Sequence, residues 1–177
     1  MRSALRRTVG IIGTTAVTAS LSVALTSGAA AEASAIPKFE MPKVFGTKFQ
    51  PDPKHDFRRL SSRHDGILRG WVTRYANGRA VYVPIRWVKD KYTEGYFVEP
   101  PKGRMRYMSR VAPNAKLYSA LNCNPFSAAR PSVDRRGLGD KLCSRKFRDS
   151  YLRKGRVPSM ITIYRGRIVK IQEIFRP

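Results

Sequence analysis

The dipeptide Asn77-Gly78 restricts the fold of this chain more than any other feature, because it stands between two runs rich in β-branched and aromatic residues. Asn-Gly favours a two-residue type I′ turn, in which both residues take positive φ. The resulting hairpin, over residues 67–89, pairs Ala76 with Arg79 and Thr73 with Tyr82. We therefore expect an antiparallel sheet built around this turn.

The same turn assigns the side chains of the hairpin to two faces, since neighbouring residues of a strand point in opposite directions. One face is aliphatic and is the expected core side: Val72, Val81, Val83 and Ile85. The other has the composition of a platform on which unpaired bases or sugar rings stack. Its residues are Arg69, Trp71, Thr73, Tyr75, Tyr82 and Arg86. The alternative is that this face is covered too, as a second side of the core.

The C-terminal region predicts a second hairpin, over residues 160–175, that turns at Arg165-Gly166. A three-residue loop with Gly166 in a bulge position pairs Ile163 with Arg167 and Ile161 with Val169. We prefer this register because it gathers the apolar side chains on one face, whereas a two-residue loop scatters them.

Residues 140–154 predict one helix, which Asp140 caps and Gly155 ends before Pro158. Cys143, Phe147 and Tyr151 follow each other at helical spacing and form its expected buried stripe. The expected fold class is therefore α+β, a mainly antiparallel β-sheet with one docked helix.

The first 31 residues have the parts of a secretory signal peptide. Arg2, Arg6 and Arg7 precede an uncharged stretch, and Ala29-Ala30-Ala31 offers a cleavage site, with further registers after residues 33 and 35. The stretch is rich in Thr, Ser, Gly and Ala, which disfavours a membrane anchor. We expect a secreted or cell-envelope protein of bacterial type, without a transmembrane segment in the mature chain.

Behind the signal peptide we expect an extended arm, residues 32–56, and a single domain, residues 57–177. Four prolines prevent a helix in the arm, and basic residues beside phenylalanines recur along it. The arm either grips an anionic polymer or a partner, or lies as a strap whose phenylalanines pack on the domain.

The two cysteines, Cys123 and Cys143, are predicted to form one disulfide, because an even count in an exported chain favours pairing. A thiol nucleophile or a metal–thiolate site would need a histidine nearby, and both histidines stand far upstream. No cofactor and no metal site are expected.

Charge is the strongest functional signal. Removal of the signal peptide takes away three of the 35 basic residues and none of the 12 acidic ones, which leaves a formal charge of +20. Such an excess destabilises the fold by self-repulsion, so we expect an anionic partner: a cell-wall polymer, nucleic acid or an anionic lipid surface. The candidate binding residues are Arg58, Arg59, Arg63, Arg69, Trp71, Tyr75, Tyr82, Arg86, Arg145 and Arg148, with further basic patches at Arg104, Arg106 and Arg110, at Arg135-Arg136 and at Arg165-Gly166-Arg167.

Two other functions stay open. His55 and His64 each precede an aspartate and lie among arginines, so a secreted ribonuclease-type toxin is the first alternative, with one imidazole as base and the other as acid. A secreted inhibitor or other partner-binding protein, presenting the arm or the loop from Asn124 to Asp140, is the second. We lean towards a binding protein rather than an enzyme.

Overall fold

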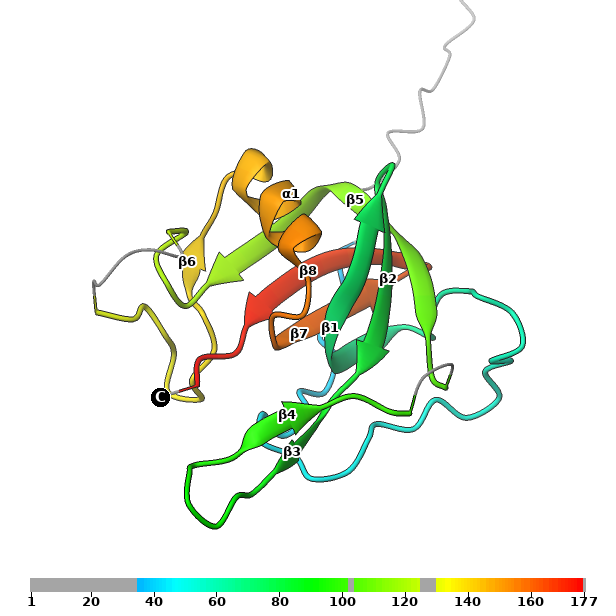
Figure 1. Cartoon of the computed structure of the whole chain (residues 1–177). Helices are drawn as coiled ribbons and strands as arrows, with labels where there is room; N and C mark the ends of the chain where they lie inside the picture. Colours follow the sequence, from blue (N-terminus) through cyan, green and yellow to red (C-terminus); the bar gives the residue numbers. More distant parts are fainter. Residues whose placement is uncertain (1–34, 102–103, 125–129, 177) are drawn as a thin grey trace, which may run out of the picture. The chain divides into compact units, whose positions relative to one another are not determined.

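The computed structural model describes residues 35–101, 104–124 and 130–176, and from Ile36 on these form one compact unit. The predicted signal peptide lies outside the described residues. In chain order the elements are β1 (Gly66–Ala76), β2 (Arg79–Pro84), β3 (Arg86–Val88), β4 (Tyr96–Val98), β5 (Tyr107–Ser119), β6 (Lys141–Leu142), α1 (Arg145–Lys154), β7 (Ser159–Tyr164) and β8 (Arg167–Glu173) (Figure 1). The predicted α+β class, mainly antiparallel with one helix, is confirmed for this part of the chain.

Five strands close into a barrel. The sheet order is β2-β1-β7-β8-β5, and a further pairing of β2 with β5 joins the two ends. All neighbours are antiparallel except β5 and β8. The short strand β6 pairs only with the end of β5. A closed barrel leaves no free edge among its five strands, and its core contains Leu68, Tyr82, Leu117, Ile161, Ile163 and Ile168.

The first hairpin turns at Asn77-Gly78, and both residues have positive φ, as predicted. Ala76 pairs with Arg79, but Tyr82 pairs with Val72 instead of Thr73 because the register shifts between Val72 and Arg74. This β-bulge adds one residue to β1 and changes which face its neighbours occupy. The predicted division into a core face and a platform face is therefore wrong: Val72 and Tyr82, expected on opposite faces, pair and both lie in the core, whereas Val81 is only half-buried.

The second hairpin also departs from the predicted register. Tyr164 pairs with Arg167 across a two-residue turn at Arg165-Gly166, both with positive φ. A register shift then gives β8 one extra residue, so that Ile163 pairs with Ile168 while Thr162 pairs with Lys170. A two-residue loop was expected to scatter the apolar side chains over both faces. The bulge prevents this, because the extra residue returns Ile161 and Ile171 to the buried side.

The helix begins five residues later than predicted. Ser144, rather than Asp140, is its cap, and the Ser144 hydroxyl accepts a hydrogen bond from the Phe147 N–H. Asp140 instead accepts a hydrogen bond from Ser132. Cys143 therefore precedes the helix, and its predicted disulfide with Cys123 is present.

A second apolar cluster lies outside the barrel core. Trp87 of β3 pairs with Phe97 of β4, and both are buried beside Met160. Phe39, Met41 and Val44 of the N-terminal segment pack against this cluster. The segment forms no strand between Ile36 and Asp65. Side-chain packing and hydrogen bonds outside the sheet, such as that from the Trp87 N–H to the Gly46 carbonyl, hold it against the barrel and β3. Among the described residues, no helix has both the length and the apolar composition needed to cross a bilayer.

Candidate functional site

Three arginines form one row across the barrel wall. Arg79, the first residue of β2, is the register partner of Arg110 on β5, and Arg110 is the register partner of Arg167, the first residue of β8. The two tight turns place the row, because Arg79 follows Asn77-Gly78 directly and Arg167 follows Gly166. All three side chains are exposed. We call these three residues the arginine row.

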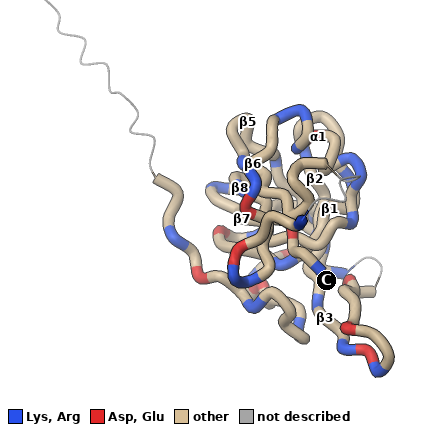
Figure 2. The backbone as a smooth tube through the Cα atoms, turned by 90° about the vertical axis from the view of Figure 1, so that its left-hand side faces the viewer, with Lys and Arg blue, Asp and Glu red and all other residues tan. Residues whose placement is uncertain are grey.

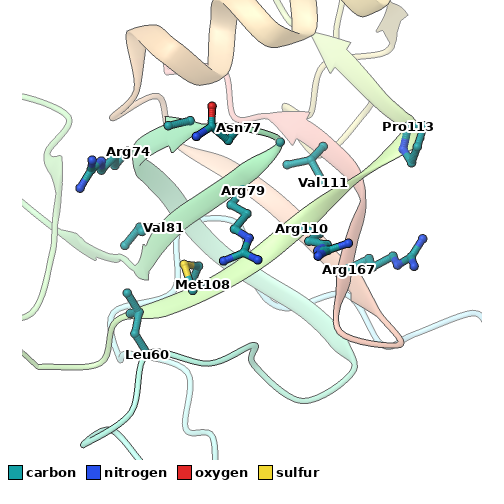
Figure 3. Close-up of a pocket in the computed structure, with 12 residues that line it drawn as sticks. Leu60, Arg74, Asn77, Arg79, Val81, Met108, Arg110, Val111, Pro113 and Arg167 are labelled. Carbon is teal, nitrogen blue, oxygen red and sulfur yellow. The ribbon is translucent and has the colours of Figure 1, made fainter.

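The arginine row borders a hollow of about 760 Å³. Arg74 lies at one end of the hollow and Arg167 at the other, with Arg79 and Arg110 between them (Figure 3). The rest of the lining consists of apolar side chains and the turn of the first hairpin: Leu60, Ala76, Val81, Met108, Val111 and Pro113, with Asn77 and Gly78. No acidic residue and no aromatic ring is among its lining residues. The hollow can therefore hold an anionic group against an apolar floor.

Like charges directly opposite each other on neighbouring strands destabilise a sheet. In the described part of the chain, none of the arginines around the hollow has an ion pair, whereas Arg136, Arg148 and Arg156 pair with Asp134, Asp149 and Glu99. Basic residues are spread over the whole unit and acidic ones are few (Figure 2). What distinguishes the arginine row from the other basic residues is its register, which places three exposed arginines side by side on neighbouring strands.

Arg69, one of the predicted binding residues, is only 2% exposed. Its guanidinium donates hydrogen bonds to three backbone carbonyls: those of Ile85 at 2.9 Å, Lys48 at 2.6 Å and Lys43. Burial lowers the pKa of Arg69 from its ordinary value. This arginine ties the N-terminal segment to β1 and does not reach a ligand at the surface.

Arg148 and Tyr82 are buried as well. Arg148 donates to the carbonyls of Pro113 and Ala115 at 3.1 and 2.9 Å, and it pairs with Asp149. Tyr82 lies in the barrel core, with its hydroxyl 2.8 Å from the Ser109 hydroxyl. Neither side chain is available to an external polymer.

The remaining platform residues do not share one surface. The Trp71 indole donates to Glu99, and Arg156 lies over its ring. The Tyr75 hydroxyl donates to Asp149, while Arg86 lies over the Phe49 ring. Each group is thus engaged by a different neighbour, and the stacking platform expected from the hairpin is not assembled.

The other predicted arginines lie at the surface but do not line the hollow. Arg58, Arg59 and Arg145 are exposed, and Arg63 is half-buried, where it donates to the carbonyls of Pro51 and His64. The loop from Asn124 to Asp140 falls partly outside the described residues. Sequence reasoning included Arg110 and Arg167 among the basic patches but missed Arg74 and Arg79. The position of Arg74 and Arg79 close to the Asn-Gly turn can be read from the sequence and could have indicated them. The pairing of β2 with β5, which brings Arg79 beside Arg110, cannot be read from the sequence.

His55 and His64 do meet, through a residue that the sequence did not single out. The Asp52 carboxylate lies 2.7 Å from His64 Nδ1 and 3.4 Å from His55 Nδ1. The aspartates that follow the two histidines are not their partners here: Asp56 instead accepts a hydrogen bond from the Arg58 N–H. His55 is enclosed, with its Nε2 atom buried, so this ring presents no free nitrogen to solvent.

No protein-family model matches this chain, and neither the curated proteins nor the solved structures contain a match.

Proposed function

We propose that this protein is exported and binds a phosphate-rich anionic polymer through the arginine row. One observation carries the proposal: three exposed arginines on three strands are held in register, at a cost in stability, beside a hollow without counter-charge. A bound phosphodiester chain relieves that repulsion. Arginine also suits phosphate, because its planar guanidinium can donate two parallel hydrogen bonds to one phosphate group.

The composition of the hollow supports contact with a polymer backbone rather than with bases. Unpaired bases are held mainly by stacking on aromatic rings, and no aromatic ring lines this hollow. Recognition by arginine alone positions a backbone and carries no sequence information. We therefore expect binding that depends on phosphate spacing and salt and that tolerates different sequences.

The order in which the chain forms the barrel strands also favours the arginine row as the binding surface. Five-stranded barrels of the oligonucleotide/oligosaccharide-binding type bind ligands on the face formed by their second and third strands. Two loops border that face: the loop that joins strands one and two, and the loop that joins strands four and five. Counting only the five barrel strands of this chain, β2 and β5 are the second and third. The turns at Asn77-Gly78 and Arg165-Gly166 are then the two loops, and the arginine row lies beside both. The likeness is one of architecture only, and the arginines are what would hold the phosphates.

Export is part of the proposal. The disulfide between Cys123 and Cys143 suits an oxidising compartment. The signal-peptide pattern of residues 1–31 would direct the chain to such a compartment. Outside the cytoplasm, phosphodiester polymers include wall polymers and nucleic acid.

The test compares two triple variants that remove the same charge. Arg79→Gln, Arg110→Gln and Arg167→Gln dismantle the arginine row, while Arg58→Gln, Arg59→Gln and Arg145→Gln change exposed arginines elsewhere. Binding to single-stranded RNA, single-stranded DNA and a purified teichoic acid is measured over a range of salt. We expect the first variant to lower the slope of log affinity against log salt by about 2, and the second to lower it much less. If both variants lowered the slope equally, the polymer would be held by the overall positive charge, and the arginine row would not be a specific binding site.

A second candidate function, RNA cleavage, is favoured by one observation: Asp52 brings His55 and His64 together. An aspartate that orients an imidazole is a common support for general acid–base catalysis. His64 would have to act at the surface, because His55 is enclosed. Loss of RNA hydrolysis in His64→Ala, with polymer binding retained, would support this candidate, and wild-type protein without hydrolytic activity would exclude it.

A further inference from the structure

Asp52 is a buried carboxylate that the fold leaves half satisfied. Its side chain is 3% exposed, and Oδ1 accepts a hydrogen bond from His64 at 2.7 Å. Oδ2 has no hydrogen-bond donor among the described residues, and the atom is shielded from solvent. Burial of a charged oxygen without a partner is costly, and such an atom in a folded protein calls for a missing ligand.

The neighbouring histidine is held rigidly beside that oxygen. A backbone hydrogen bond from the His55 N–H to the Asp52 carbonyl closes a tight turn, which brings the two side chains together. The rings of Phe57 and Tyr107 flank the His55 imidazole, with centroids 4.7 and 4.8 Å from its own. His55 Nδ1 is thereby fixed 3.4 Å from Asp52 Oδ2. That nitrogen and that oxygen lie close together without a hydrogen bond between them.

We propose that Asp52, His55 and His64 form a binding site for a divalent transition-metal ion of the Zn²⁺ class. One nitrogen or oxygen atom from each residue lies within 4.8 Å of the others. Zn²⁺ binds imidazole nitrogen and carboxylate oxygen at about 2.0–2.2 Å, which places tetrahedral ligand atoms about 3.3 Å apart. The Asp52–His55 separation already meets this requirement. His64 alone needs to adjust, and its side chain is 61% exposed and therefore free to do so.

The donor set decides the class of ion. Two imidazoles and one carboxylate suit zinc and its transition-metal neighbours, whereas Ca²⁺ and Mg²⁺ take oxygen ligands. Both cysteines are bonded to each other and supply no thiolate. Three protein ligands leave a fourth position, and the exposure of His64 directs that position towards solvent.

The test begins with the purified protein, carrying no histidine tag, stripped of metal with a chelator and kept oxidised. Calorimetric titration with Zn²⁺ should show one equivalent bound. Co²⁺ in its place should give the visible absorption of a four- or five-coordinate ion. In NMR spectra, Zn²⁺ should shift the ring resonances of both histidines.

His64→Ala is the decisive variant, because an exposed side chain can be removed without harm to the fold. We expect it to weaken Zn²⁺ binding by more than about 100-fold, since even changes behind the ligands of a metal site cost 10–100-fold. Asp65→Asn is the matched control, as it removes the next carboxylate along the chain, and it should bind as wild type. The proposal is overturned if wild-type protein takes up no Zn²⁺, if His64→Ala binds like wild type, or if only the His64 ring responds. The arginine-row variant should bind Zn²⁺ normally, so this proposal and the proposed function fail or succeed separately.

Discussion

Arg79 and Arg110 lie directly opposite each other on the antiparallel strands β2 and β5, so the barrel wall holds two guanidinium groups on one pair of register partners. Arg167 extends the arrangement on the other side of Arg110. A pair of like charges in this position works against folding. If the arginine row binds an anionic polymer as proposed, replacing Arg110 should change stability and binding in opposite directions.

We expect Arg110→Gln to make the protein more stable and to weaken polymer binding. Loss of the central charge removes both repulsive neighbours, which should raise the free energy of unfolding by about 0.5–1 kcal/mol. Urea denaturation measures the first effect and a salt-controlled binding assay the second. Arg58→Gln in the N-terminal segment is the control: it removes the same charge from an exposed position outside any helix or strand and should leave stability within about 0.5 kcal/mol of wild type. A less stable Arg110→Gln would contradict the repulsion argument.

Arg69→Met should destabilise the protein by about 3 kcal/mol, because it leaves the three carbonyls of Lys43, Lys48 and Ile85 without their donor. The guanidinium geometry matters more than the charge, since no carboxylate pairs with Arg69 in the described chain. Arg69→Lys should therefore recover little of the loss. Denaturant unfolding of both variants measures the difference, and a lysine variant as stable as wild type would show that charge alone suffices.

Gly46→Ala tests the same contact from the other side. A β-carbon at residue 46 would lie 2.3 Å from Arg69 Nη1, closer than real β-carbons come to other atoms. Because the guanidinium is fixed by its carbonyls, it cannot move aside without breaking hydrogen bonds. We expect a loss of about 1–3 kcal/mol in denaturant unfolding. In the Arg69→Met background the alanine should cost much less, and equal costs in both backgrounds would argue against a clash.

Local features of the fold could be predicted from sequence, because local chemistry decides them. The Asn77-Gly78 turn, the pairing of Ala76 with Arg79 and the disulfide were predicted correctly. The two bulges could not be foreseen. Each depends on which side chains the closed barrel accepts: the shift between Val72 and Arg74 places Val72, rather than Thr73, opposite Tyr82 in the core.

The candidate site was largely hidden for the same reason. The row unites Arg79, Arg110 and Arg167 through pairings between strands that are distant in sequence. Likewise, the partner of both histidines is Asp52, three residues before one and twelve before the other. Charge and composition indicated an anionic partner, but only the strand register shows which arginines stand together.

The disulfide offers a separate test of stability. Cys123 and Cys143 close a loop with a sequence separation of 20. The loop-entropy estimate for such a closure is about 3 kcal/mol. We expect Cys123→Ser with Cys143→Ser to lose about that much in urea denaturation, and reduction of the wild type to give the same loss. Addition of reductant to the double variant is the control and should change nothing.

Alkaline conditions should weaken the fold through Tyr82. Burial raises the pKa of this phenol above its ordinary value of 10.0, although hydrogen bonds with Ser109 and the Arg63 N–H partly offset the effect. Above about pH 10 the unfolded chain therefore loses the proton while the folded chain still holds it, which favours unfolding. The contribution of Tyr82 to stability is complete below that pH and is lost as the pH rises towards the folded value.

Tyr82→Phe isolates this contribution. The variant should be about 1 kcal/mol less stable than wild type at neutral pH, because the Ser109 hydroxyl loses a hydrogen-bond partner in the core. It has no phenol to ionise, so the difference between the two proteins should shrink as the pH is raised above about 10. Urea denaturation at a series of pH values measures the difference. A difference that stays constant across that range would mean that Tyr82 ionises equally easily in both states, and that its burial does not control its proton.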